Sequence, residues 1–370
     1  MVKKKSSKEK REIRVLLTKT ENDIIKHLRE KGVLPPVSAI ERDIFLKKTR
    51  DKIEALKEKY NQALKEIEAL KVKAKILTTS LNEPVISYTY KKPGKKITSE
   101  AIPIVVASDW HVEERVRPSS VNNLNEYNPD IAKERIRNFF RTTVKLISMY
   151  RKRSSIDTVV LALLGDLITG FIHDEYRESN FMSPLTAILF VRDEIINGIN
   201  FLMSETRLKK LIVPCSYGNH GRTTKDIRHE TSAENSFEQH LYYLLESYYE
   251  KNKRIEFMIN NSYHTYITLF DKYTIRFHHG DHIKYRGGIG GITVPVNKSI
   301  AQWNKSISAD LDVFGHYHQL IDGGNFVANG SIIGYNAFAL NIKASFERPK
   351  QAFVLIEKTY GKIATHSIIL

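Results

Sequence analysis

The stretch LALLGDLITG, residues 161–170, decides the fold, because it reads as a buried strand that ends at a carboxylate. Residues 161–164 have the length and apolar composition of a strand buried in an α/β domain. Gly165 and Asp166 follow as a turn signal and place one carboxylate at the end of that strand. This pattern is common by itself, so its meaning depends on what the other strands end in.

Four other predicted strands end in the same few residue types. These strands cover residues 102–107, 211–213, 273–277 and 311–314, and they lead into Asp109 and His111, Asn219 and His220, His278 and His279, and His316 and His318. Asp, Asn and neutral His are ligands for Mn²⁺, Fe or Zn²⁺, and the chain has no Cys₄ or Cys₂His₂ pattern. We therefore expect a metal site where the strand ends meet.

Two of these strand ends carry ligands two residues apart. Asp109 and His111 form one pair, and His316 and His318 form the other. On extended backbone such residues point to the same side, because the side-chain period of a strand is two. A single His-x-His pair often occurs by chance, but two pairs with a shared carboxylate suffice for two metals. Two metals about 3.5–4 Å apart can clamp both the attacking and the leaving oxygen of a phosphoryl transfer.

The order Asp-x-His, Gly-Asp, Gly-Asn-His, His-Gly and Gly-His-x-His resembles the calcineurin-like metallophosphoesterase superfamily, and its nuclease-like branch in particular. The resemblance covers residues 101–370 and says nothing about the first hundred residues. It implies a four-layer α-β-β-α domain that hydrolyses phosphoric esters by attack of a hydroxide bridging two metals.

The resemblance also implies a role for each strand-end residue. Asp109, His111 and His318 would hold one metal, Asn219, His279 and His316 would hold the other, and Asp166 would bridge the two. His220 would stabilise the transition state or protonate the leaving oxygen. His279 is preferred over His278 because the family's ligand precedes glycine, so His278 is expected on the opposite face of its strand. The cofactor would be two divalent metal ions, with Mn²⁺ favoured over Fe, Zn²⁺ and Mg²⁺.

The sequence departs from the family pattern at two places. The family often has an acidic residue after Gly-Asn-His, where this chain has Gly221, so we expect Asp174 or Glu175 to orient His220. Residues 167–170 lack the Arg and Asp of the protein-phosphatase branch. Arg222 is a candidate to bind a phosphate oxygen, with a solvent-facing arginine as the alternative.

Three regions are predicted along the chain. Residues 1–77 form a basic helical and partly coiled-coil region, residues 78–100 a linker, and residues 101–370 the metallophosphoesterase domain. A first helix is expected over residues 21–31, and Ser38 can cap a longer one. In that longer helix, apolar residues follow a heptad pattern at Ile53, Leu56, Tyr60, Ala63, Ile67, Leu70, Ala74 and Leu77. Residues 38–77 therefore predict self-association, or else packing against the main domain.

The remainder of the chain alternates short apolar strands with helices expected over residues 131–151, 184–203 and 236–251, which predicts an α/β domain. The segment from Asp312 to Leu370 is mostly strand and turn, and we expect its strands to complete a second sheet. The glycine-dense residues 287–291 predict a flexible loop, or a loop that closes over substrate near His279.

The charge of the chain is concentrated at its N-terminus. Residues 1–100 have 26 Lys and Arg against 14 Asp and Glu, so +12 of the formal +16 lies there. Such a segment favours nucleic acid as a partner, while a solvated helix is the alternative. The single cysteine, Cys215, follows an apolar strand and is expected to be buried. One cysteine, no secretory signal and no membrane-length apolar run predict a cytoplasmic protein without a membrane partner.

Three functions compete on these grounds. The favoured one is a phosphodiesterase or nuclease acting on DNA or RNA. The second is a phosphatase or phosphodiesterase for small phosphoesters or a phosphoprotein, with the N-terminal helices serving only assembly. The third is a non-catalytic scaffold, which is disfavoured because every ligand position of the family pattern is filled.

Overall fold

The structure of the chain is a computed structural model, which describes residues 21–32, 39–82, 99–285 and 290–370. It divides into two compact units, Met1–Lys92 and Pro93–Leu370. We describe each unit by itself. The predicted cap Ser38, most of the linker and residues 287–289 of the glycine-dense segment lie outside the described residues.

The smaller unit contains two helices, α2 (Glu21–Glu30) and α3 (Ala39–Asn82). Helix α3 is 44 residues long and continues past the predicted helix end at residue 77. The predicted heptad stripe is largely uncovered, because Leu56, Tyr60, Ile67 and Leu70 are exposed. Among the described residues, none shields these four side chains from solvent.

The larger unit contains a seven-stranded sheet in the order β12-β11-β1-β3-β4-β5, with β2 paired to β1. The strands are β1 (Ser99–Ala107), β2 (Ser154–Ser155), β3 (Thr158–Leu163), β4 (Lys210–Pro214), β5 (Ile255–Met258), β11 (Lys350–Glu357) and β12 (Gly361–Ile369). Strands β1, β3, β4 and β5 are parallel, and β11 and β12 are antiparallel to their neighbours. These four parallel strands therefore all have their C-terminal ends on the same side of the sheet.

A five-stranded sheet has the order β6-β7-β8-β10-β9. Its strands are β6 (Thr265–Leu269), β7 (Tyr273–Phe277), β8 (Leu311–Phe314), β9 (Ile321–Asp322) and β10 (Phe326–Ala328). The prediction that the C-terminal strands complete this second sheet is right for β9 and β10 and wrong for β11 and β12. Strand β11 is buried along nearly its whole length and pairs with β1, which would otherwise leave a buried edge unpaired.

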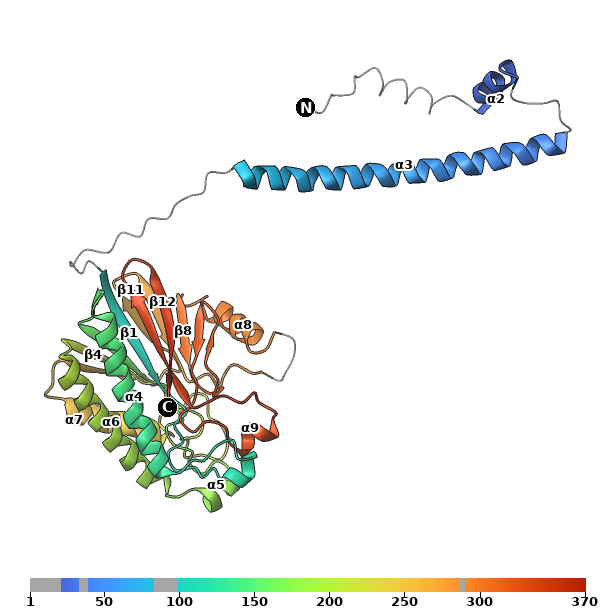
Figure 1. The fold of residues 1–370 in the computed structure, drawn as a ribbon. Coiled ribbons are helices and arrows are strands. Elements are labelled where there is room, and N and C mark those ends of the chain that lie inside the picture. The colour runs from blue at the N-terminus through green and yellow to red at the C-terminus, as the bar shows by residue number, and fades with distance from the viewer. Residues whose placement is uncertain (1–20, 33–38, 83–98, 286–289) are drawn as a thin grey trace. The chain divides into compact units, whose positions relative to one another are not determined.

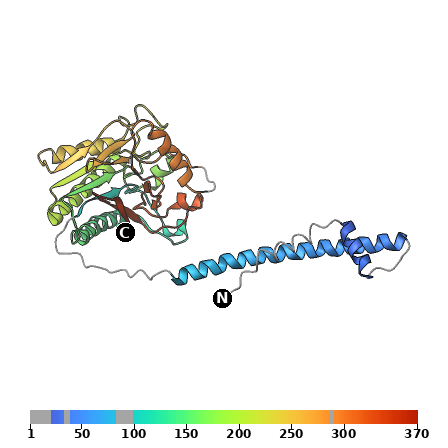
Figure 2. The same ribbon diagram turned by 90° about the horizontal axis from the view of Figure 1, so that it is seen from above.

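The helices α4 (Pro129–Tyr150), α6 (Pro184–Thr206) and α7 (Phe237–Tyr249) cover one face of the larger sheet (Figures 1 and 2). Their apolar side chains form one core with that face, which includes Phe139, Val191, Leu241, Leu161 and Val213. These helices begin where polar caps accept backbone N–H groups: Asn128, Ser183 and Ser236. Helices α4 and α6 approach closely at Gly198, where an added Cβ would lie 2.0 Å from the Phe140 ring.

The other face of the larger sheet packs against the smaller sheet. Ile104, Val106 and Val160 from one sheet share a core with Ile275 and Val313 from the other. Helix α8 (Thr293–Trp303) belongs to a third cluster, with Phe314 and Phe326 of the smaller sheet. Three short helices complete the unit: η1 (Pro118–Val121), α5 (Asp174–Ser179) and α9 (Ala337–Asn341). The unit is a mixed α/β structure with two sheets, as the sequence predicts.

No helix within the described residues is long and apolar enough to span a membrane.

Candidate metal centre

The five strand ends named above converge in the larger unit. Strands β1, β3 and β4 come from one sheet and β7 and β8 from the other. Backbone hydrogen bonds join the loops that follow them: Asp109 N–H donates to the Gly165 carbonyl, and Trp110 N–H donates to the Asp166 carbonyl. The His316 N–H donates to both carboxylate oxygens of Asp109 at 3.0 Å. Residues as far as 207 positions apart are thus held in one place by hydrogen bonds from main-chain N–H groups.

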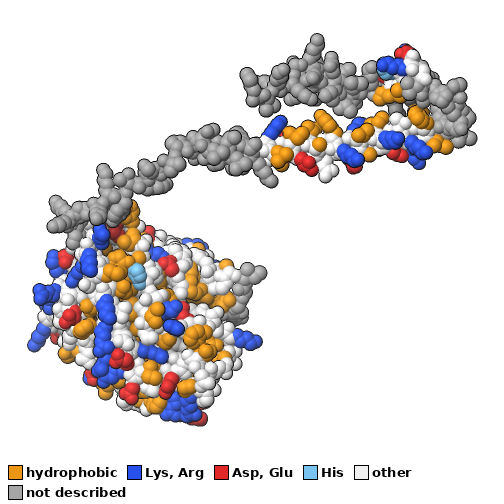
Figure 3. Space-filling model, in the orientation of Figure 1, with side chains coloured by type: hydrophobic (Ala, Val, Ile, Leu, Met, Phe, Trp, Pro, Cys, Tyr) orange, Lys and Arg blue, Asp and Glu red, His pale blue; other side chains and the backbone are white. Residues whose placement is uncertain are grey.

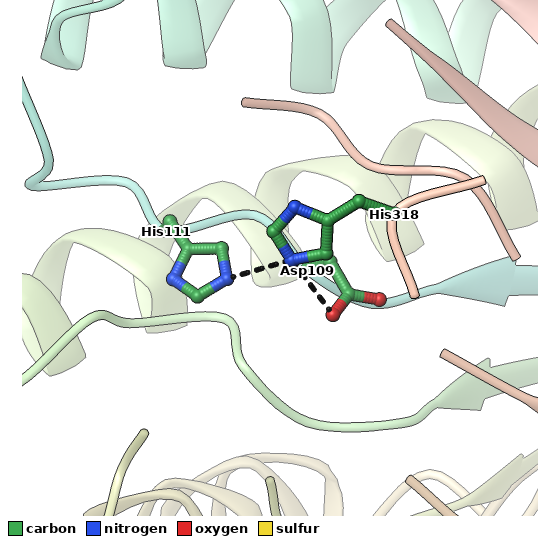
Figure 4. Close-up of side chains that lie close together, drawn as sticks. All are labelled: Asp109, His111 and His318. Carbon is green, nitrogen blue, oxygen red and sulfur yellow. Dashed lines mark hydrogen bonds and ion pairs between the residues drawn. The ribbon is translucent and has the colours of Figure 1, made fainter. Parts of the chain in front are cut away.

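Asp109, His111 and His318 form the first group of possible metal ligands (Figure 4). The Nε2 atoms of His111 and His318 lie 3.3 Å apart, and the His318 Nε2 lies 3.3 Å from Asp109 Oδ1. On its other side, the His111 Nδ1 lies 3.1 Å from the Thr169 hydroxyl. This second contact fixes the ring so that Nε2 faces the other two ligands.

Asp166, His279 and His316 form the second group, and Asn219 lies beside them. The His279 Nδ1 donates to the Leu164 carbonyl at 2.7 Å, which leaves Nε2 as the ring nitrogen that can face a metal. That Nε2 lies 3.0 Å from Asp166 Oδ2 and 3.2 Å from the Asn219 Oδ1. The rings of His279 and His316 pack edge to face, with their centroids 5.2 Å apart.

The chemistry of these donor atoms fits divalent cations. Each group brings a carboxylate oxygen and imidazole nitrogens within 4.8 Å of one another. Burial lowers the pKa of His111 well below its ordinary value, with further lowering by His220 and His318, and burial lowers that of His316 to about 4. Neutral imidazoles offer lone pairs, and lone pairs that converge on each other are stable only around a cation or a proton. These residues could therefore hold metal ions in two adjacent groups.

Asp166 belongs to the second group and also contacts His111 of the first through its backbone. Its backbone carbonyl accepts the N–H groups of Trp110 and His111, while its Oδ1 accepts the N–H of His220 at 2.8 Å. Burial would raise the pKa of Asp166, but His279 and His220 hold it well below its ordinary value. Conversely, Asp166 raises the pKa of His279 well above its ordinary value despite burial. The carboxylate is thus ionised and has Oδ2 directed at the second group.

The backbone at the ligands differs from the prediction. The sequence predicts extended backbone for both pairs, but φ is 56° and 48° for Asp109 and His111 and 71° and 56° for His316 and His318. Asp166 has φ of 49°, so five of the seven predicted ligands adopt the left-handed region. The pairs converge because each lies in a tight turn after its strand. Such conformations cost roughly 1–3 kcal/mol each and cluster at functional sites.

His220 lies beside the first group, with its ring 4.8 Å from that of His111. The prediction that Asp174 or Glu175 orients it is wrong, because its Nδ1 donates to the Thr169 carbonyl at 3.2 Å. Asp174 is exposed on α5, where Arg177 is its ion-pair partner. Instead, the ring of Tyr176 contacts His220 at 5.8 Å. Burial lowers the pKa of His220, which Asp166 partly offsets.

Three further predictions concern residues around the centre. Arg222 donates from Nε, Nη1 and Nη2 to the carbonyls of Thr224, Asn219 and Lys225, which makes it a brace for its own loop. His278 lies away from the ligands, stacked on Phe314, as its strand position predicts. Cys215 is buried, as expected, and burial raises its pKa well above the ordinary value.

Glu238 is a residue of the centre that the sequence did not reveal. It lies in the first turn of α7, is fully buried, and accepts the Leu167 N–H at 2.6 Å and the Gly218 N–H at 2.7 Å. Leu167 follows Asp166 and Gly218 precedes Asn219, so one carboxylate ties together two ligand loops. The absence of a side chain at Gly221 makes room for it, because a Cβ there would lie 2.8 Å from Glu238 Cγ.

Glu113 and Glu114 are also buried beside the first group. Glu113 Oε1 accepts the N–H groups of Thr169 and Gly170, both at 2.8 Å, and Glu114 Oε1 accepts an N–H from the Asn336 side chain. Burial raises the pKa of Glu113 to about 8 and that of Glu114 to about 7. Their position two and three residues after His111 is a signal that the sequence offers. Glu238 gave none, because only the fold brings α7 to the centre.

No known protein family matches the chain, and no curated protein sequence matches it.

Proposed function

We propose that residues 101–370 form a dinuclear-metal-dependent phosphoesterase domain of the calcineurin-like metallophosphoesterase type, with four α-β-β-α layers. The observation that carries the proposal is the pairing of two ligand groups around Asp166, the first holding Asp109 and the second His279. The order of the packing clusters, from α4, α6 and α7 through two sheets to α8, supports the four layers.

Two divalent ions, Mn²⁺ in the favoured case, would supply Lewis acidity and an activated water for attack on phosphorus. The chain's own residues hold and orient the reacting groups. Asp109, His111 and His318 would hold one ion, and Asn219, His279 and His316 the other, with Asp166 between them. His220 donates its Nδ1–H to the Thr169 carbonyl, so Nε2 is the nitrogen that would accept a proton and pass it to the leaving oxygen.

The substrate we favour is a phosphodiester of DNA or RNA. The positive charge of residues 1–100 supports this choice, because clustered Lys and Arg bind phosphate backbones by releasing counterions. The exposed stripe of α3 supports a homo-oligomer through residues 38–77 as a second part of the proposal.

The experiment is a hydrolysis assay of the full chain, loaded with Mn²⁺, on single- and double-stranded DNA, RNA and bis-p-nitrophenyl phosphate. We expect cleavage of nucleic acid, and its loss in Asp166→Asn and His220→Ala. His240→Ala, which changes an exposed histidine on the outer side of α7, is the matched control and should keep full activity.

Turnover of the small diester without any cleavage of nucleic acid would replace the nuclease by the phosphodiesterase for small substrates. Metal bound in both groups without turnover of any substrate would leave only a scaffold. Either result contradicts the nuclease proposal.

A further inference from the structure

The N-terminal edge of the larger sheet, opposite the candidate metal centre, is strongly basic. Three basic segments, 151–153 (RKR), 207–210 (RLKK) and 251–254 (KNKR), lie in the loops before β3, β4 and β5, with Lys210 as the first residue of β4. Because β3, β4 and β5 are parallel and adjacent, these three loops lie side by side at one edge. We call these three segments the basic edge.

The net positive charge of the domain is concentrated at the basic edge. Windows 151–157, 205–210 and 250–256 contain nine Lys and Arg against four Asp and Glu. Residues 101–370 as a whole have 32 Lys and Arg against 28 Asp and Glu. The net excess of the edge therefore exceeds that of the whole domain. In Figure 3, Lys and Arg side chains gather on this part of the larger unit, where the chain leaves α4 in Figure 1.

Only three of these nine Lys and Arg side chains form hydrogen bonds or ion pairs within the described residues of the domain. Arg151 binds the carbonyls of Ile156 and Thr206, so it braces two loops. Lys209 and Lys210 form ion pairs with Asp157 and Glu256. The other six are exposed and have no ion-pair partner in the described part of the chain: Lys152, Arg153, Arg207, Lys251, Lys253 and Arg254. A cation in the last turn of a helix offsets the helix dipole, but that effect is confined to this turn and does not account for six.

The basic edge also has a pocket that can bind an anion. An open hollow of about 390 Å³ lies between the end of α6 and the start of β5. Arg207 and Arg254 line it together with Asn200 and Asn252. Guanidinium groups suit phosphate oxygens because their planar N–H donors can bind two oxygens at once.

We propose that the basic edge docks the phosphate backbone of duplex DNA, away from the metal centre. This inference rests on the proposed function for its ligand class and adds a second contact surface. Two strand spacings of about 4.8 Å separate β3 from β5, so the outer loops lie about 10 Å apart, close to the roughly 12 Å width of the major groove. Long Lys and Arg side chains on these loops can therefore reach both backbones beside one groove. Single strands are usually held by aromatic side chains that stack on the bases, and the three basic segments contain none.

The chain enters the domain at this same edge. Ser99, at the start of β1, pairs with Ser154, which follows Arg153 directly. The sequence before Ser99 contains Lys91, Lys92, Lys95 and Lys96. These lysines therefore precede β1, whose first residue pairs beside the basic edge, by only a few residues of sequence.

The test measures binding of a fluorescent DNA duplex to the full chain in EDTA, where no metal supports cleavage. The test variant is Lys152→Gln/Arg153→Gln/Lys253→Gln. The control, Lys145→Gln/Lys298→Gln/Lys343→Gln, removes the same charge from exposed positions elsewhere in the domain. We expect at least about tenfold weaker binding for the test variant only, and a slope of log K against log salt that is smaller by about 3.

Equal affinities of the test variant and the control would overturn the inference, as would the absence of duplex binding in the wild type. Tighter binding of a single strand, or of an RNA duplex, would overturn the choice of duplex DNA. Hydrolysis of bis-p-nitrophenyl phosphate with Mn²⁺ should be equal in the wild type and both variants. If duplex binding follows the prediction but nothing is hydrolysed, the docking surface stands and the proposed function fails.

Discussion

Asp166 contacts both groups of candidate ligands, through its backbone carbonyl on one side and its carboxylate on the other. We expect Asp166→Asn to lose both metals, because a neutral amide oxygen is a poor bridge between two cations. Metal content after gel filtration should fall from two ions per chain to none. Asp109→Asn is the matched control and should lose one ion. Retention of one ion by Asp166→Asn would show that the residue belongs to a single metal.

The His220 ring makes no hydrogen bond to the carboxylate of Asp109 or Asp166, so the role of His220 can be separated from metal binding. We expect His220→Asn to lower kcat by about 10²–10⁴ for a substrate with a poorly stabilised leaving group, because a positioned acid contributes on that order. Metal content should stay at the wild-type value, as elemental analysis would check. A loss of metal together with activity would make His220 a ligand instead.

The sequence predicted the ligand types better than their geometry. Strand ends with Asp, His and Asn indicated which residues meet, and the structure brings these seven together. The left-handed backbone of Asp109 or His318 could not be foreseen, since non-glycine residues rarely adopt it. The partner of His220 is a main-chain carbonyl, which no side-chain pattern reveals. Glu238 comes from an element that no motif connects to the centre.

At the scale of elements, α7 fixes two ligand loops through Glu238. Burial raises the pKa of this carboxyl to about 7 from an ordinary value of 4.5, so the folded state binds its proton more tightly than the unfolded state. The resulting stability is complete below about pH 4.5 and is lost as the pH rises through about 7. In the metal-free wild type, the unfolding free energy should therefore fall by an amount on the order of 2–3 kcal/mol as the pH rises through this range. We expect Glu238→Gln to abolish this fall, because glutamine does not titrate.

Urea denaturation in EDTA at pH 5 and pH 8 would measure this difference. Comparing the two proteins removes the contributions of Glu113 and Glu114, whose pKa values are raised in the same direction. An identical pH dependence in the variant would mean that Glu238 stays ionised in the folded state.

Helices α4 and α6 pack at a glycine that helix propensity alone would not place there. Gly198→Ala should gain about 1 kcal/mol of helix propensity but lose about 1–3 kcal/mol to the clash with Phe140. We expect a net loss of stability in thermal denaturation. Ser204→Ala, on an exposed face of the same helix, is the control and should be neutral or slightly stabilising. A stabilised Gly198→Ala would mean that the helices move apart at little cost.

The helices of the larger unit and the alternation of strands with helices were predictable, because hydrophobic period and caps act locally. The assignment of β11 to the larger sheet was not, since which neighbour β1 takes is a long-range choice. The apolar residues of β11 fit either sheet, and nothing in their sequence distinguishes the two.

At the scale of the whole molecule, α3 exposes an apolar stripe that a second copy can cover. We expect the wild type to sediment as an oligomer and Leu56→Asp/Ile67→Asp to sediment as a monomer, because buried carboxylates oppose a coiled-coil seam. Glu58→Gln/Lys65→Gln changes the opposite side of the helix and should leave the oligomer intact. A monomeric wild type at all concentrations would refute self-association.

The left-handed ligands have a consequence for how this sequence can change. Glycine at Asp109, His111, Asp166, His316 or His318 would relieve backbone strain while deleting the donor atom. Laboratory selection for thermal stability alone would therefore favour glycine at these positions, and the centre would be lost residue by residue. Sequences that keep all five residues therefore indicate continued selection for the function of the centre, independently of any assay.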